Sequence, residues 1–136
     1  YNIFTVSGTV AIRSLYGVVE TIIPNTSSAI HLSVFSAGGE VVLTKIAGAP
    51  DIDTLAVDSW LMKVDPASGI ISMNSALTPK ILESTVSSPD AEFIVVADAD
   101  QTTYIRLNLT AALASGEIHW HCSWEPRSDD GQVTGA

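Results

Sequence analysis

The chain contains very little cysteine and very little charge. Its 136 residues include one cysteine, so no disulfide can form within the chain. Charged residues make up 15% and hydrophobic residues 46%, whereas an average soluble domain has about 25% charged residues. No stretch of the sequence approaches the roughly 18 apolar residues of a membrane-spanning helix, so we expect no membrane partner. A chain this apolar and poorly charged is expected to have part of its surface covered by neighbours in an oligomer or larger assembly.

Basic residues are scarce and do not cluster. Six Lys and Arg oppose fifteen Asp and Glu, which gives a formal net charge of -9. The basic residues lie singly along the chain, at Arg13, Lys45, Lys63, Lys80, Arg106 and Arg127. Proteins that bind nucleic acids meet the phosphate backbone with clustered positive charge. We therefore expect no nucleic-acid partner.

Motifs that carry catalysis or bind cofactors are also missing. The sequence has no G-x-S-x-G elbow, no phosphate loop and no dinucleotide fingerprint. The Asp pairs at 51 and 53 and at 98 and 100 lack the pattern and distal Glu of a calcium loop. Asp is common in turns because its side chain bonds to nearby backbone, and we expect that role here. The sequence thus predicts a non-enzymatic protein without catalytic residues, metal or cofactor.

The sequence is rich in two-residue alternation, which is the pattern of a half-buried strand. In FTVSGTVAIR, the side chains of Phe4, Val6, Val10 and Ile12 share one face, and Gly8 on the same face predicts a bulge or a close approach of another segment. The segment 14–17 has the composition of a turn. A second strand, GVVETII, is expected after it.

Further alternating segments follow at spacings of about eight to twelve residues, as in all-β sandwiches and barrels. Two hairpins are predicted around the turns at 37–39 and 65–69, and further strands at 80–86, 92–97, 102–112 and 117–124. Evidence for helix is limited to one short turn within 51–60, capped by Asp51. The predicted fold is all-β, an antiparallel β-sandwich or β-barrel of jelly-roll type with little helix. It forms a single domain over residues 1–136, in which 126–136 is a candidate extended C-terminal tail.

The segment EIHWHCSWEP, residues 117–126, concentrates the unusual side chains. As a strand it places Trp120, Cys122 and Trp124 on one face, and His119 and His121 on the other. The cysteine therefore points away from the histidines, which favours a core strand over a His/Cys metal site. Two alternatives remain: the histidines bind zinc with a third ligand such as His31 or a carboxylate, or one of them gathers at a threefold axis as a pH-sensitive contact.

Both ends of the sequence resemble small virion proteins of tailed bacteriophages, which are often encoded among the head and structural genes. The similar segments are IFTVSGTVAIRSLYGVV and GEIHWHCSWEPRSDDGQV. The matching positions are Phe4, Val6, Gly8, Val10, Gly17 and Val18 near the start, and Gly116, Ile118, Trp120, Cys122, Trp124, Pro126, Asp130, Gly131 and Val133 near the end. The middle, roughly 30–110, is similar only in layout. Arg127 departs from the pattern, which more often has a small or apolar residue there.

The resemblance implies a capsid decoration (cement) protein. Such a protein is a compact β module that forms a homotrimer, contacts the major capsid protein and braces the shell at the outer capsid surface of the virion, after synthesis in the bacterial host cytoplasm. Segment 126–136 is then expected to order only against a neighbouring subunit or the capsid. The implied assembly contacts are Phe4, Trp120, Trp124, Pro126, Arg127 and Asp130.

A second function remains open from the sequence, namely a receptor- or glycan-binding module of a phage head or tail fibre. Sugars stack on exposed aromatic rings. Trp60 and Tyr104 are the candidates for such rings.

Overall fold

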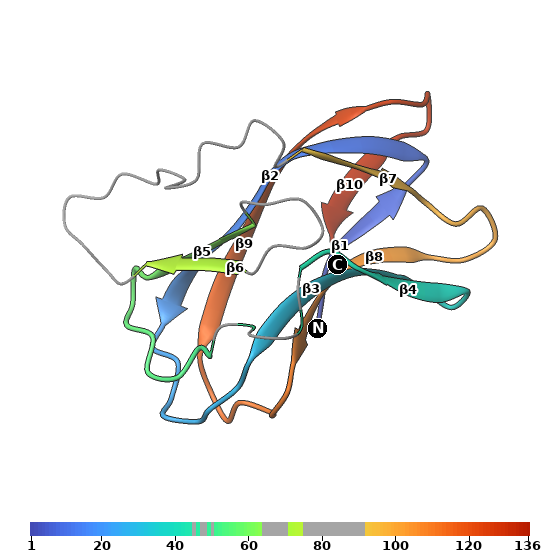
Figure 1. Cartoon of the computed structure of the whole chain (residues 1–136). Coiled ribbons are helices and arrows are strands. Elements are labelled where there is room, and N and C mark those ends of the chain that lie inside the picture. Colours follow the sequence, from blue (N-terminus) through green and yellow to red (C-terminus); the bar gives the residue numbers. More distant parts are fainter. Residues whose placement is uncertain (45, 47–48, 50, 64–70, 75–91) are drawn as a thin grey trace.

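The structure is a computed structural model that describes residues 1–44, 46, 49, 51–63, 71–74 and 92–136, with 71–74 described by their backbone. Its elements are strands (Figure 1). They are β1 (Asn2–Ser7), β2 (Thr9–Thr21), β3 (Ile30–Ser36), β4 (Gly39–Val42), β5 (Trp60–Lys63), β6 (Ile71–Asn74), β7 (Phe93–Val96), β8 (Thr103–Leu109), β9 (Glu117–Pro126) and β10 (Gln132–Gly135). Within these residues there is no helix, hence none of the length and hydropathy that crossing a bilayer demands.

The strands form two antiparallel sheets that pack against each other as a sandwich rather than closing into a barrel. Sheet A has the order β10-β1-β8-β3-β4. In sheet B the order is β6-β5-β2-β7, and β9 also pairs with β2. Val10 pairs with both β7 and β9, and Gly17 with both β5 and β9. Strands β5 and β7 therefore share one edge of β2, and β9 occupies the other edge. The all-β antiparallel prediction is confirmed.

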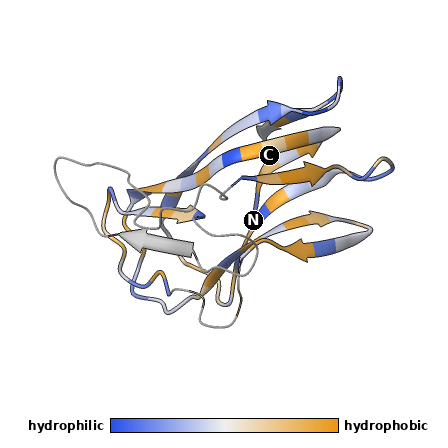
Figure 2. Cartoon of the chain, turned by 45° about the horizontal axis from the view of Figure 1, so that its top comes forward, coloured by the Kyte–Doolittle hydropathy of each residue, from blue (hydrophilic) through white to orange (hydrophobic). Residues whose placement is uncertain are grey.

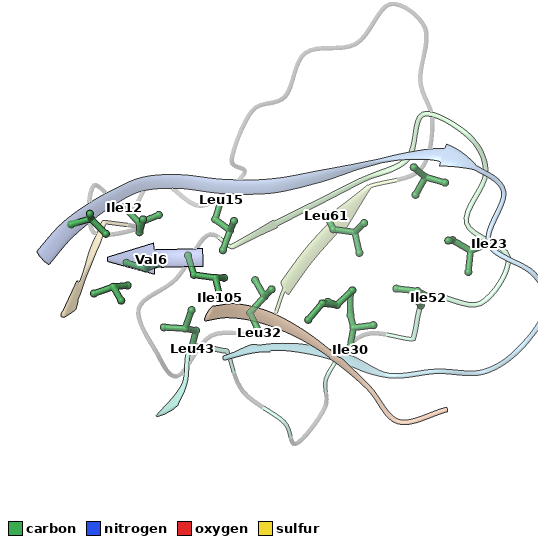
Figure 3. Packing of buried hydrophobic residues seen from close by; sticks show 14 residues of the cluster. Val6, Ile12, Leu15, Ile23, Ile30, Leu32, Leu43, Ile52, Leu61 and Ile105 are labelled. Carbon is green, nitrogen blue, oxygen red and sulfur yellow. The ribbon is translucent and has the colours of Figure 1, made fainter. Parts of the chain in front are cut away.

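The core lies between the two sheets (Figure 3). Leu15 and Leu61 of sheet B face Leu32 and Ile105 of sheet A, and all four side chains are at most 1% exposed. Alternate residues point inward along most strands whose side chains the structure describes, so hydrophilic and hydrophobic residues alternate along much of the ribbon in Figure 2. This arrangement removes the apolar face of each sheet from water, which is the main favourable contribution to folding.

The long strand β2 corrects one prediction. We expected a turn at 14–17, but β2 runs unbroken from Thr9 to Thr21. Its pairing with β9 shifts between Ile12 and Ser14, so the inward-facing residues change from even to odd numbers. Such a bulge lets one strand contain two alternation patterns. In the sequence, this change of parity is indistinguishable from a turn between two strands.

Gly8 is the corner at which the chain passes from sheet A to sheet B. Strand β1 ends at Ser7 and β2 begins at Thr9, and Gly8 between them has a φ of +56°. A Cβ at this position would lie 2.4 Å from Oδ1 of Asp130 and 2.6 Å from Oγ of Ser128. The close approach predicted at Gly8 is therefore confirmed, and the segment that approaches is the turn after β9.

Several other predicted segments can be compared with the structure. The hairpin around 37–39 is present as β3 and β4, and β5 pairs with β6. The helical turn within 51–60 is absent: the Asp51 carboxylate instead accepts hydrogen bonds from the backbone N–H groups of Ser28 and Asp53, at 2.8 and 3.1 Å. This local bonding competes with helix formation. The turn at 65–69 and the strand at 80–86 lie outside the described residues.

The C-terminal segment is ordered against its own chain. Residues 132–135 form β10, which pairs with β1 from Phe4↔Gly135 to Ser7↔Gln132. We expected 126–136 to be an extended tail that orders only against a neighbour. The structure corrects this expectation, because β1 offers a free sheet edge that satisfies the backbone groups of β10.

Candidate assembly surface

Strand β9 is an edge strand that pairs with one neighbour. It is ten residues long and pairs with β2 from Val10↔Pro126 to Thr21↔Glu117. Among the strands that the structure describes, no other pairs with β9. Along a strand, the N–H and C=O groups of alternate residues point toward opposite edges, so every second residue of β9 points these groups away from β2. Toward the described residues, the outer side of β9 therefore presents a row of unpaired backbone groups, which is a template for another strand.

The inner face of β9 carries the tryptophans and the cysteine. Trp120, Cys122 and Trp124 are half-buried and pack against the core. Phe4 of β1, which lies in the opposite sheet, is half-buried in the same way. Burial raises the pKa of the Cys122 thiol to about 11. A thiol of that kind is protonated and unreactive near neutral pH, which agrees with Cys122 as a packing residue.

The outer face of β9 carries the histidines. His119 is exposed, with Nε2 3.0 Å from Oε1 of Glu117 and Nδ1 3.8 Å from Oε1 of Glu20. The His121 ring stacks on the Tyr16 ring of β2, with centroids 4.9 Å apart. The predicted separation of the cysteine from the histidines is confirmed. Across the described part of the chain, no group of three or more His, Cys, Asp or Glu is arranged to hold a metal ion, so the zinc alternative gains no third ligand.

Four charged side chains form a network on the outer face of sheet B. Arg13 bonds the carboxylates of Glu92 and Glu125, the latter at 2.7 Å. Arg127 approaches the same two carboxylates, at 3.5 and 3.6 Å. The hydrogen bond from Arg13 lowers the pKa of Glu125, and the same bond raises the pKa of Arg13. Exposed pairs of this kind add little stability, but they fix the direction in which these charges point.

Exposed apolar side chains lie beside this network. Ile94 and Val96 of β7 are 61% and 70% exposed. Ile94 pairs in register with Ala11 of β2, which pairs with Glu125 of β9, so the three residues lie in one row across sheet B. We call Arg13, Glu92, Ile94, Val96, Glu125 and Arg127 the outer patch of sheet B. The exposure of Ile94 and Val96 was not predicted from the sequence. The four consecutive apolar residues Phe93–Val96 could have indicated it, because a strand that is buried on one face leaves two of them in solvent.

The predicted assembly contacts fall into two groups. Phe4, Trp120 and Trp124 are half-buried between the sheets. Pro126, Arg127 and Asp130 are exposed near the turn after β9. The turn itself is fastened to the Gly8 corner: the Thr9 N–H donates to Oγ of Ser128 at 2.7 Å, and the Ser7 hydroxyl donates to the carbonyl of Asp130 at 3.0 Å. The structure thus brings together three of the six predicted residues at one end of β9.

The aromatic candidates for sugar binding occupy other positions. Trp60 is 4% exposed and Tyr104 is half-buried. The Trp60 ring is therefore covered by its own chain, whereas the Tyr104 ring keeps part of its surface in solvent. An apolar hollow of about 450 Å³ does open at one end of the sandwich, lined by residues that include Ile3, Leu113 and Trp120.

The chain was compared with known proteins at three levels. No protein family, curated protein or solved structure matches it.

Proposed function

We propose that the chain is a non-enzymatic structural protein that works by self-association, most specifically a capsid decoration protein of a tailed bacteriophage. It acts as a homotrimer on the outer surface of the shell and braces neighbouring copies of the major capsid protein. The observation that carries the proposal is the outer patch of sheet B, where Ile94 and Val96 stand in solvent beside four oriented charges. Contiguous exposed apolar side chains with a charged rim are typical of protein interfaces.

The two segments that carry the phage resemblance support this proposal. They are separated by most of the sequence, yet they meet at the Gly8 corner, where the Thr9 N–H donates to the Ser128 hydroxyl and the Ser7 hydroxyl donates to the Asp130 carbonyl. The residues of the pattern thus have a structural task that needs no catalytic group. A protein of this kind requires a rigid β module with a fixed display of surface side chains.

Bracing a shell needs many contacts rather than one strong contact. An interface of two exposed apolar residues and a few ion pairs is small and weak by itself. Repetition around a symmetric ring converts later contacts into intramolecular ones, which raises the overall affinity without new chemistry. The low charge content and open sheet edge suit such repeated self-contact.

The native mass of the purified chain tests self-association. We expect a species of three times the 14.3 kDa chain mass by sedimentation. Lysines at Ile94 and Val96 (I94K/V96K) should dissociate it. The matched control, I22K/V57K, changes two residues that are 58% and 45% exposed elsewhere, and it should leave the trimer intact. A monomer at high concentration contradicts trimerisation, and dissociation of the control as well contradicts the assignment of the outer patch.

A pull-down tests the proposed partner. Empty shells of a tailed-phage major capsid protein, produced together with this chain, should retain the wild-type protein during sedimentation through a cushion. The I94K/V96K variant should be lost from the pellet because each trimer contact contributes to retention. Equal amounts of both proteins in the pellet contradict the role of self-association in binding, and no retention of the wild type contradicts the decoration function.

A further inference from the structure

Strand β9 lacks the features that usually protect an exposed edge. Natural edge strands are blunted by lysines, prolines, bulges or a short length. β9 has ten residues, contains no lysine, and has its one proline at the last position. The two register shifts in its ladder with β2 leave Arg13 and Glu20 unpaired, so both extra residues belong to β2. β9 itself is regular from Glu117 to Pro126, and its outer edge is ready to pair.

We propose that this edge pairs with β9 of a second copy, antiparallel and about a twofold axis that passes beside Cys122. An isologous pairing of this type joins the two B sheets into one continuous sheet. The proposal goes beyond the proposed function and does not depend on it, because it stands on the edge alone.

Symmetry leaves few registers for such a pair. Residues that stand directly opposite in an antiparallel ladder lie on the same face of the sheet. In a pair of identical strands, the two facing residues are therefore separated by an even number of positions in the sequence. The residue midway between them faces its own copy, and the twofold axis, perpendicular to the sheet, passes beside that residue. We call this residue the centre of the register. Only the registers centred on His121 and on Cys122 overlap nearly the whole of β9.

Charge selects between these two registers. Centring on His121 places Glu117 opposite Glu125, and the twofold axis repeats this repulsion. Centring on Cys122 instead places Glu117 opposite Arg127, the residue that follows β9, and the twofold axis repeats this attraction. Glu117, Glu125 and Arg127 are all exposed on the structure. Opposite charges in facing positions stabilise a strand pair, and like charges destabilise it.

The register centred on Cys122 also pairs the aromatic residues. Trp120 stands opposite Trp124 of the second copy on the inner face, and both indoles are half-buried in the single chain. Cross-strand aromatic pairs are among the more stabilising ones. The area covered by one strand edge is small, so the contact between two isolated chains is weak. In an array of symmetric assemblies, the same contact would link one assembly to the next.

Cysteine cross-linking reads this register directly. In a Cys122→Ala background, cysteines are placed at His121 and Ser123, both exposed on the outer face. In the proposed register, residue 121 of one copy stands directly opposite residue 123 of the other copy. Residue 121 of one copy lies diagonally from residue 121 of the other, about 7–8 Å away, and the same holds for residue 123. A disulfide needs Cα atoms within about 7 Å. We therefore expect the double variant, H121C/S123C, to give a covalent dimer of twice 14.3 kDa on a denaturing gel after copper-phenanthroline oxidation. Each single variant should run there as an uncross-linked chain.

Each other outcome overturns the proposal in a distinct way. A dimer from H121C alone places the axis beside His121, and a dimer from S123C alone places it beside Ser123. No cross-link in any variant, with wild-type circular dichroism, means that β9 does not pair with itself. None of these results changes the native mass of the wild-type chain, so they are separate from the test of trimerisation.

A charge exchange gives an independent measurement. The variant E117R faces Arg127 of the second copy with a like charge, which should reduce cross-linking of the H121C/S123C pair several-fold. Adding R127E restores an opposite pair and should restore the yield. Restoration supports the register, and a yield that does not respond to either change contradicts it.

Discussion

The Gly8 corner offers the sharpest test of how the structure is held together. Gly8 has a φ of +56°, a left-handed conformation that other L-residues adopt at a cost of about 1–2 kcal/mol. A methyl group there would also lie 2.4 Å from Oδ1 of Asp130 and 2.6 Å from Oγ of Ser128. Both contacts are shorter than real Cβ atoms tolerate. The substitution Gly8→Ala therefore has to displace the Ser128 and Asp130 side chains, which fasten the turn after β9 to the corner.

The expected loss follows from the contacts that this displacement breaks. The turn is fastened by hydrogen bonds between Thr9 and Ser128, at 2.7 Å, and between Ser7 and Asp130, at 3.0 Å. Each such bond contributes about 1 kcal/mol net. Loss of one or both bonds, together with the backbone strain, should lower the free energy of unfolding by about 2–4 kcal/mol.

Urea unfolding at a fixed protein concentration measures this loss. With a slope of about 2 kcal/mol per molar urea, the middle of the usual range, the midpoint should fall by about 1–2 M. The control is Gly39→Ala, at the first residue of β4, where an added Cβ meets nothing within 4 Å and φ is not positive. A Gly8→Ala midpoint within about 0.3 M of the Gly39→Ala midpoint would refute the argument that the turn and the corner hold each other.

Two further predictions concern the core. Leu61 is 0% exposed, so Leu61→Ala should lower the free energy of unfolding by about 2–5 kcal/mol. The control Val57→Ala, at a 45% exposed position, should change this free energy by less than about 0.5 kcal/mol. Calorimetry measures the loss for both variants. The Cys122 thiol, with its pKa raised to about 11 by burial, should react slowly with a thiol reagent at pH 8 and faster as the pH approaches 11, and rapid reaction of the folded protein at pH 8 would contradict its burial. Because the unfolded chain loses this proton first, near pH 9, this thiol should lower the free energy of unfolding as the pH rises from about 9 to about 11.

Alternation along the sequence predicted most of the strands because it reports directly on one-sided burial. It placed Val6, Val10 and Ile12 correctly in the core, and it gave the correct division of β9 into a tryptophan face and a histidine face. Alternation does not carry information about pairing. The sequence could not show that β9 pairs with β2 or that β10 pairs with β1, since both contacts join segments about a hundred residues apart.

The errors have identifiable physical causes. The bulge after Ile12 shifts the alternation of β2 by one residue, and local composition cannot distinguish that shift from a turn. The final residues contain little apolar side-chain surface, so their sequence resembles a disordered tail. In the structure they are ordered largely by backbone hydrogen bonds to β1, which no side-chain pattern records. The exposure of Ile94 and Val96 likewise depends on which face of β7 is covered.

The pairing of β1 with β10 also brings the two ends of the chain together. Ala136 donates its N–H to the carbonyl of Ile3 at 3.3 Å, and the N and C labels lie near each other in Figure 1. A short linker could join the ends, and the chain could be reopened in the exposed β3–β4 turn at Gly38. Such a circular permutant would keep the ladders of both sheets. Any segment fused to either end would leave the sandwich at the same place, so tags on the two ends would report on one common site of the surface.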